Sequence, residues 1–302
     1  MDFLKKYPLP IAGLILAILA LGNLLKPYGE GLRTVLGLIG GVLYLIYLIK
    51  LIVFNTKLSE ALEHPVVASV FPTFTMATML VPTYIKPYAP ALAPVIWYIG
   101  VIGHVVLYLW FSKNHVLNFS TKKVFPSWYI VYVGIAVGSV SSPAVEQLKV
   151  GQIAFWLAFV SYFAILPFVL YRVWKVGEIP EPAKPTLIVL SAPASLLLAG
   201  YLSAFEVKSA TMVYLLATLS YLFYFIALYY LSKLMMSKFS PSFSAFTFPL
   251  VISAIAGKMF AGYMKAGAVL AMLVKVQEAV AFCIVVFVLF HYMRFLFKSE
   301  NA

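Results

Sequence analysis

The sequence predicts an all-α membrane protein built from ten spanning helices. Of its 302 residues 63% are hydrophobic and 11% are charged, and the mean hydropathy is +0.98, whereas a soluble domain carries about 25% charged residues. Long apolar runs recur along the chain without the alternation that marks strands, which favours helices because they satisfy their backbone hydrogen bonds internally. We therefore expect a single transmembrane domain over residues 1–302.

Each predicted span is a run of about 20 mostly apolar residues, the length that crosses about 30 Å of hydrocarbon. Charged residues, prolines or glycines bound the runs, and ten runs meet this criterion. They cover residues 9–25, 33–54, 66–85, 89–111, 127–145, 150–172, 186–205, 210–233, 244–263 and 274–297.

Lysine and arginine are distributed unevenly over the two sets of predicted loops. The loops on the side of the two termini hold 14 of them and the opposite loops hold eight, and this imbalance predicts cytoplasmic termini in an inner or plasma membrane. The net charge of +12 is then mostly a topology signal. Basic residues scattered between apolar runs do not form the patch of a nucleic-acid-binding protein, so no nucleic-acid partner is expected.

A repeat organises the ten runs. The odd-numbered runs begin at intervals of 56 to 61 residues, a nearly fixed period that predicts five helical hairpins. The odd-numbered runs contain residues that interrupt helices, as at Phe71-Pro72 and Phe248-Pro249, whereas most even-numbered runs are uninterrupted apolar stretches.

Prolines remove a backbone hydrogen bond and kink a helix. Against lipid the freed carbonyl group would stay unsatisfied, whereas around a protected or wet interior it is tolerated. We therefore expect five kinked helices in a quasi-fivefold arrangement around a central pore, with five apolar helices outside. Tight packing is the alternative, because Pro and Gly are common in membrane helices. The pore-lining candidates are Phe71, Pro72, Thr75, Gly134, Gly138, Pro193, Ser195, Thr247 and Pro249.

No motif in the sequence indicates an enzyme. Glu63-His64 does not extend into a zinc-peptidase HExxH, and neither a GxSxG element nor a Walker loop occurs. The four histidines are dispersed, and the single cysteine, Cys283, lies inside an apolar run. We expect a protein without catalytic residues, metal or cofactor.

Two ionisable residues are expected at membrane depth, where such groups are candidates for function. Lys258 lies late in the ninth run and Glu278 early in the tenth, both toward the outer face. One interpretation is a structural ion pair. The other is that Lys258 gives an outer vestibule positive potential and attracts anions. The odd-numbered runs hold no charge near their centres, and without charged rings a pore selects weakly.

Six stretches along the chain carry a family resemblance. They are residues 8–14 (PLPIAGL) with 21–24 (LGNL), 63–66 (EHPV), 71–73 (FPT), 126–128 (PSW) with 133–134 (VG), 185–186 (PT) with 192–196 (APASL), and 241–249 (PSFSAFTFP). By these stretches, in this order, the chain resembles the tellurite-resistance/dicarboxylate transporter family, which includes bacterial tellurite-resistance channels, fungal malate permeases and plant guard-cell slow anion channels.

The resemblance implies a homotrimer in which each protomer encloses its own pore between five inner helices. It also implies that a phenylalanine on the ninth helix, matched here by Phe248, plugs that pore, and that a glycine matched by Gly13 faces it. Lys258 matches a basic residue near the end of the ninth helix. A phenyl ring across a narrow lumen blocks ions sterically and by dewetting. Packing in the core or against lipid is the alternative for one of 24 phenylalanines.

Two functions remain open at this point. The leading hypothesis is a passive, weakly selective channel for small inorganic or dicarboxylate anions, occluded by Phe248. The alternative is a coupled transporter or exporter of four-carbon dicarboxylates such as malate, or of oxyanions such as tellurite. Coupling to protons normally uses a carboxylate or histidine chain in the path, and the odd-numbered runs offer none near their centres, which favours the channel.

Overall fold

The computed structural model describes residues 2–117 and 119–298, and all regular secondary structure in them is helical. The predicted all-helical class is confirmed. Nine helical stretches in these residues are long and apolar enough to cross a membrane. They are Ile11–Tyr28, Glu30–Val53, Pro65–Ile85, Leu92–Val116, Leu148–Val176, Glu181–Ala204, Ala210–Leu234, Pro241–Tyr263 and Ala268–Phe297.

The predicted run over residues 127–145 is broken into short pieces. Helix α9 (Trp128–Val133) ends before Gly134, α10 (Ala136–Ser141) follows, and the 3-10 turn η4 (Ser142–Val145) completes the segment. At the break the amide groups of residues 137 and 138 bond to carbonyl groups three residues earlier instead of four. The pieces are too short to stand among the nine long stretches.

Buried and exposed helical segments alternate along the chain. In the buried long stretches 72 to 89% of the residues are buried, against 22 to 39% in the exposed ones. The exposed helices are α3 (Glu30–Val53), α8 (Leu92–Phe111), α11 (Leu148–Tyr171), α13 (Ala210–Leu234) and α15 (Ala268–Phe297). The buried elements are α2 (Ile11–Leu25), α5 (Pro65–Val70), α6 (Thr73–Leu80), α7 (Pro82–Ile85), α12 (Ala192–Ala204) and α14 (Thr247–Tyr263), with the 3-10 helices η6 (Glu181–Ser191) and η7 (Pro241–Phe246).

Prolines lie where the buried elements change their helix type or begin anew. Pro72 caps the start of α6, Pro82 begins α7, and Pro193 lies in the first turn of α12. Proline suits these positions because its missing N–H is not needed in the first turn of a helix. The exposed helices instead present large apolar side chains on their outer faces, as at Leu38 and Ile52 of α3.

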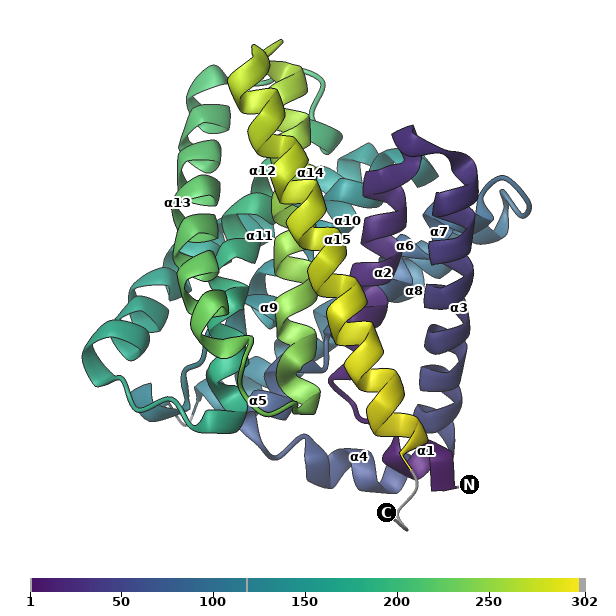
Figure 1. The fold of residues 1–302 in the computed structure, drawn as a ribbon, viewed down its shortest axis with the longest axis vertical. Coiled ribbons are helices and arrows are strands. Elements are labelled where there is room, and N and C mark those ends of the chain that lie inside the picture. Colours follow the sequence, from purple (N-terminus) through teal and green to yellow (C-terminus); the bar gives the residue numbers. More distant parts are fainter. Residues whose placement is uncertain (1, 118, 299–302) are drawn as a thin grey trace.

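Each buried element packs against the exposed helix that follows it, so that α2 contacts α3, α6 contacts α8, α10 contacts α11, α12 contacts α13 and α14 contacts α15. The buried elements also contact one another in sequence, α2 with α6, α6 with α10, α10 with α12 and α12 with α14, and α14 returns to α2. The buried elements therefore form a closed circuit of contacts. In Figure 1, α2, α12 and α14 lie between the exposed helices α3 and α13.

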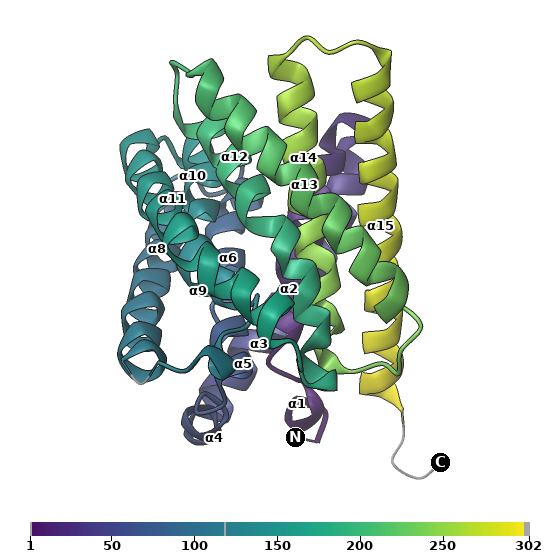
Figure 2. The ribbon, with the colours of Figure 1, turned by 90° about the vertical axis from the view of Figure 1, so that its left-hand side faces the viewer.

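The molecule has two distinct ends along the helix axes. The short helices α1 (Asp2–Lys6) and α4 (Asn55–Ala61) lie at one end together with the last turn of α15 (Figure 2). We call this the near end and the opposite end the far end. The starts of α2, α5 and η7 lie toward the near end, and the loop from α14 to α15 lies at the far end.

Candidate functional site

Three cavities follow one another between the buried elements. A near vestibule of about 490 Å³ and a far vestibule of about 290 Å³ flank a neck of about 30 Å³. Val70, Ser244 and Ala245 line both the near vestibule and the neck, whereas Leu196 and Phe248 line both the neck and the far vestibule. The shared residues make the three cavities one interrupted path through the protein.

All five buried segments contribute to the neck. Gly13 comes from α2, Thr73 and Met76 from α6, and Phe248 from α14. The other lining residues are Val70, Tyr129, Ile130, Val133, Gly134, Val189, Ala192, Pro193, Leu196, Ser244, Ala245 and Pro249. A water molecule occupies about 30 Å³ in the liquid, so the neck has no room for a hydrated ion.

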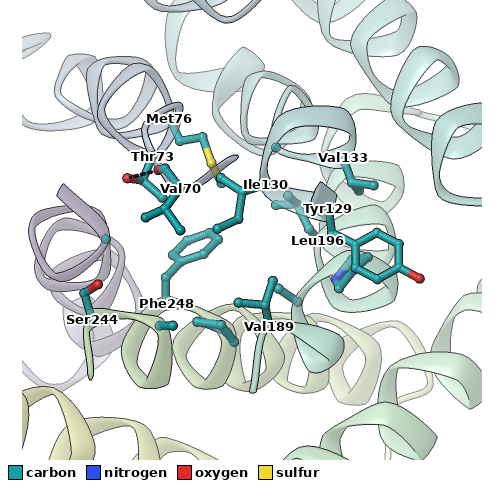
Figure 3. Close-up of a pocket in the computed structure, with 16 residues that line it drawn as sticks. Val70, Thr73, Met76, Tyr129, Ile130, Val133, Val189, Leu196, Ser244 and Phe248 are labelled. Carbon is teal, nitrogen blue, oxygen red and sulfur yellow. Dashed lines mark hydrogen bonds between the residues drawn. The ribbon is translucent and has the colours of Figure 1, made fainter. Parts of the chain in front are cut away.

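The Phe248 side chain lines the neck and projects into it. Its ring projects from the first turn of α14 toward Val70 and Ile130 on the opposite side (Figure 3). The residue is 6% exposed, which shows that its neighbours enclose it. Next to it, Thr247 Oγ1 lies 2.6 Å from the Ser244 carbonyl oxygen and 3.3 Å from that of Gly13, and these contacts fix the start of α14 against α2.

The wall of the neck is almost entirely apolar. Thr73 Oγ1 donates to the Val70 carbonyl oxygen at 2.8 Å, and the Tyr129 hydroxyl group points away from Phe248 (Figure 3). None of the described residues that line the neck is charged. An ion in the neck would therefore lose its water without gaining a charged partner, and ion passage there is opposed by steric exclusion and dehydration together.

Five of the predicted site residues meet at the neck. Gly13, Gly134, Pro193, Phe248 and Pro249 come from four different buried segments and line the same small cavity. Lys258 lies apart from them on the wall of the far vestibule. The structure therefore brings together residues that the sequence separates by up to 236 positions.

The other candidates do not line any of the three cavities, and they are Phe71, Pro72, Thr75, Gly138, Ser195 and Thr247. Thr75 Oγ1 lies 2.7 Å from Nδ1 of His104 on α8. Ser195 Oγ lies 2.7 Å from the Ser220 hydroxyl oxygen. Phe71 packs against Phe74 with 4.8 Å between ring centroids. These side chains hold buried elements to their neighbours instead of facing the path.

Most of the apolar residues that line the neck could not be predicted from the sequence. Val70, Met76, Ile130 and Leu196 line the neck, yet nothing in the sequence separates them from ordinary core residues. Three residues of the near vestibule, His64, Lys122 and Lys123, were not predicted either. The adjacent residues Lys122 and Lys123, just before the predicted run 127–145, could have indicated a positively charged entrance to the path.

The far vestibule contains the ion pair that the sequence left open. Lys258 Nζ lies 2.6 Å from Oε1 of Glu278 and 3.2 Å from the Leu24 carbonyl oxygen. The Glu278 side chain is 5% exposed, so its charge depends on this partner. Lys258 also lines the vestibule. Lys258 therefore both forms a structural ion pair and lines the far vestibule.

No group of three or more His, Cys, Asp or Glu side chains with metal-binding geometry occurs in residues 2–117 and 119–298. The polar groups of the described residues that line the path are hydroxyl groups, one amide group, the His64 imidazole and three lysines.

Comparisons with known proteins identify the family of this chain. A family model described as voltage-dependent anion channel matches residues 7–293. The tellurite resistance protein TehA homolog of Haemophilus influenzae is 25% identical over 223 residues, which cover 67% of this chain and 66% of that protein, just under two thirds of its length. The resemblance inferred from the six sequence stretches is confirmed. With the match extending over nearly the whole length, this multi-pass membrane protein belongs to the voltage-dependent anion channel family, a family of anion-transport proteins.

Proposed function

We propose that the protein is a passive, weakly selective anion channel whose pore is occluded by the Phe248 ring. One observation carries the proposal. Phe248 lines both the 30 Å³ neck and the far vestibule, and its ring projects into the neck that lies between two cavities large enough for hydrated ions. A rotation of that side chain would join them without moving a helix.

In this proposal the five buried segments form a quasi-fivefold ring, and each pairs with the exposed helix after it as a hairpin. The broken segment over residues 127–145 is the tenth span. Contacts that run from α2 through α6, α10, α12 and α14 back to α2 support the ring. Residues 1–302 then form one transmembrane domain of the inner or plasma membrane, and the near vestibule opens to the cytoplasm.

Electrostatics favour anions at both mouths of the path. Lys122 and Lys123 line the near vestibule and Lys258 lines the far one, and lysines in a low-dielectric funnel raise the local anion concentration. The uncharged neck adds no chemical filter. Small inorganic anions that shed water easily should therefore permeate best, with dicarboxylates as the larger candidates.

A homotrimer is proposed as the assembly. Large apolar side chains on the exposed helices would contact lipid or neighbouring protomers, as Leu38 and Ile52 of α3 and Leu109 of α8 illustrate. Each protomer would then have its own path, because all five buried segments of a single chain contribute to the neck.

The test is the anion current of purified protein in planar bilayers. Wild type should pass small currents, and Phe248→Ala should pass large currents that reverse at the anion equilibrium potential. Phe246→Ala is the matched control, because Phe246 is fully buried two residues earlier and lines none of the three cavities. A folded Phe248→Ala protein without current would refute the gate. Counterflow of malate or tellurite by the same protein would then establish the coupled transporter.

A further inference from the structure

One side-chain amide group in the far vestibule is held in a fixed orientation. Asn23, near the end of α2, lines this vestibule. Its Oδ1 accepts from Arg33 Nε at 3.2 Å, and its Nδ2 donates to Thr83 Oγ1 at 2.9 Å. Because a guanidinium group only donates, Arg33 determines which end of the amide is the oxygen. The Asn23 side chain therefore turns its oxygen toward Arg33 and keeps its N–H groups on the other side.

Arg33 is itself held by several partners. Arg33 Nη2 donates to the Thr83 carbonyl oxygen at 2.6 Å, and Arg33 Nη1 lies 3.3 Å from Glu30 Oε2. The guanidinium group also lies over the Tyr84 ring, 4.8 Å from its centroid. The Arg33 side chain is 15% exposed and does not line the vestibule. Its role is to hold the Asn23 side chain in place.

The hydroxyl groups that line the far vestibule already form hydrogen bonds within the protein. Thr83 Oγ1 donates to the Leu80 carbonyl oxygen at 2.7 Å and accepts from Asn23. Ser141 Oγ donates to the Val137 carbonyl oxygen at 2.8 Å and accepts from Trp97 Nε1. An amide NH₂ group has two hydrogens to donate, and Thr83 takes one. The second Asn23 hydrogen is the neutral donor that this wall can offer to a ligand.

Lys258 lines the same vestibule as Asn23. It contacts the carbonyl oxygen of Leu24, the residue after Asn23, and it pairs with Glu278. An ammonium group has three hydrogens to donate, so these two contacts leave one for the vestibule. Glu278 also accepts a hydrogen bond from the Tyr28 hydroxyl group, and its Oε2 lies 3.9 Å from Lys275 Nζ.

We propose that the far vestibule contains a binding site for one monovalent anion, held between the Asn23 amide group and the Lys258 ammonium group. This inference rests on the proposed function and specifies its substrate class. Lys258 is the one charged residue among the described residues that line this vestibule, and it shares Glu278 with Lys275. The two lysines and one glutamate leave one net positive charge, which matches one monovalent anion.

That charge balance selects against dianions. A four-carbon dicarboxylate would fit within about 290 Å³, so its size does not exclude it. Its second carboxylate, however, would lie against Leu80, Val140 and Ile255, which give it no hydrogen bond. Burying an unpaired charge against apolar side chains is strongly unfavourable. Chloride and nitrate need one set of donors, and they match the site.

The test measures binding in the closed protein, because the far vestibule lies outside the Phe248 ring. Purified wild type should broaden the chloride NMR signal, and nitrate should reverse the broadening at a lower concentration than malate. Asn23→Leu removes the amide donor and should abolish most of the specific broadening. Asn23→Asp, which still accepts from Arg33 and preserves the fold, should abolish it as well. Lys149→Gln, at an exposed lysine that lines none of the three cavities, is the control and should leave the Asn23-dependent broadening intact.

Glu278→Gln provides a test in the opposite direction. It removes the negative charge that Lys258 and Lys275 share and should tighten chloride binding by about tenfold. Unchanged broadening in both Asn23 variants would overturn the site, and displacement by malate before nitrate would overturn the monovalent class. Both results leave the Phe248→Ala current untouched. Conversely, Asn23-dependent binding without any Phe248→Ala current would refute the channel and keep the site.

Discussion

His104 Nε2 lies 3.1 Å from the carbonyl oxygen of Val131, across the break between α9 and α10. In a continuous helix that carbonyl group would accept from the amide of Ile135, but α9 ends at Val133. Because the Val131 carbonyl oxygen only accepts, the neutral ring carries its hydrogen on Nε2, and Nδ1 is left as an acceptor 2.7 Å from Thr75 Oγ1, which also lies 2.7 Å from the Pro72 carbonyl oxygen. A buried histidine thus replaces a backbone bond at the edge of the neck.

Replacing His104 should destabilise the fold. His104→Leu leaves the Val131 carbonyl group and the Thr75 hydroxyl group buried without this partner, which should lower the free energy of unfolding by about 1–3 kcal/mol. Thermal unfolding in detergent measures the loss. His291→Leu is the control, because His291 is half-buried and bonds only within its own helix, to the Phe287 carbonyl oxygen. Equal losses in the two variants would contradict the role of His104.

The break itself requires glycine at position 134. A Cβ atom there would lie 2.2 Å from the Ile130 carbonyl oxygen and 2.8 Å from His104 Cε1. Because the first of these atoms belongs to the backbone, Gly134→Ala should shift α9 and lower the melting temperature. Gly41→Ala should be neutral or slightly stabilising, since a Cβ atom at this helical position meets nothing within 4 Å. Comparable melting curves for the two variants would show that the break tolerates a side chain.

Gly13 should set the width of the path once the ring is removed. A Cβ atom at this position would lie 3.3 Å from the Cβ atom of Ser244, which lines the neck from the neighbouring segment η7. In a Phe248→Ala background, we expect Gly13→Val to reduce single-channel conductance several-fold and Gly13→Ala to reduce it less. Conductance that is independent of side-chain size would mean that ions do not pass Gly13.

The orientation can be measured with single cysteines. Cys283 is the only cysteine in the sequence, so Cys283→Ala gives a clean background. In it, Lys122→Cys at the near end should react with a membrane-impermeant maleimide only from the cytoplasmic side. Tyr88→Cys, at a site 87% exposed at the far end, should react only from outside. The reverse pattern would invert the proposed topology.

The sequence predicted the exposed helices well. The predicted run 33–54 corresponds to Glu30–Val53, and 210–233 corresponds to Ala210–Leu234. These boundaries were readable because charged or turn-forming residues end each apolar run. The prolines also identified the buried elements, since the backbone bonds that they remove are tolerated only away from lipid.

The rotation of each buried helix could not be predicted. Thr75 was predicted to line the pore. Instead Thr73 and Met76 line the neck, and Thr75 contacts His104 of α8. A helix that is apolar on every side has no amphipathic pattern to show which face is turned inward. Gly134 was among the residues expected to distort the buried helices, but the position of the break after Val133 could not be predicted, because His104 of another helix takes part in it.

The 3-10 geometry of η6 has a consequence for the wall of the path. With three residues per turn, side chains three positions apart lie directly above one another, and Ala183, Thr186, Val189 and Ala192 have this spacing. The first two line the near vestibule and the last two line the neck. In an α-helix the same residues would drift around the axis by about 60° at each step. The tighter coil gives the path a straight strip of small side chains about 18 Å long.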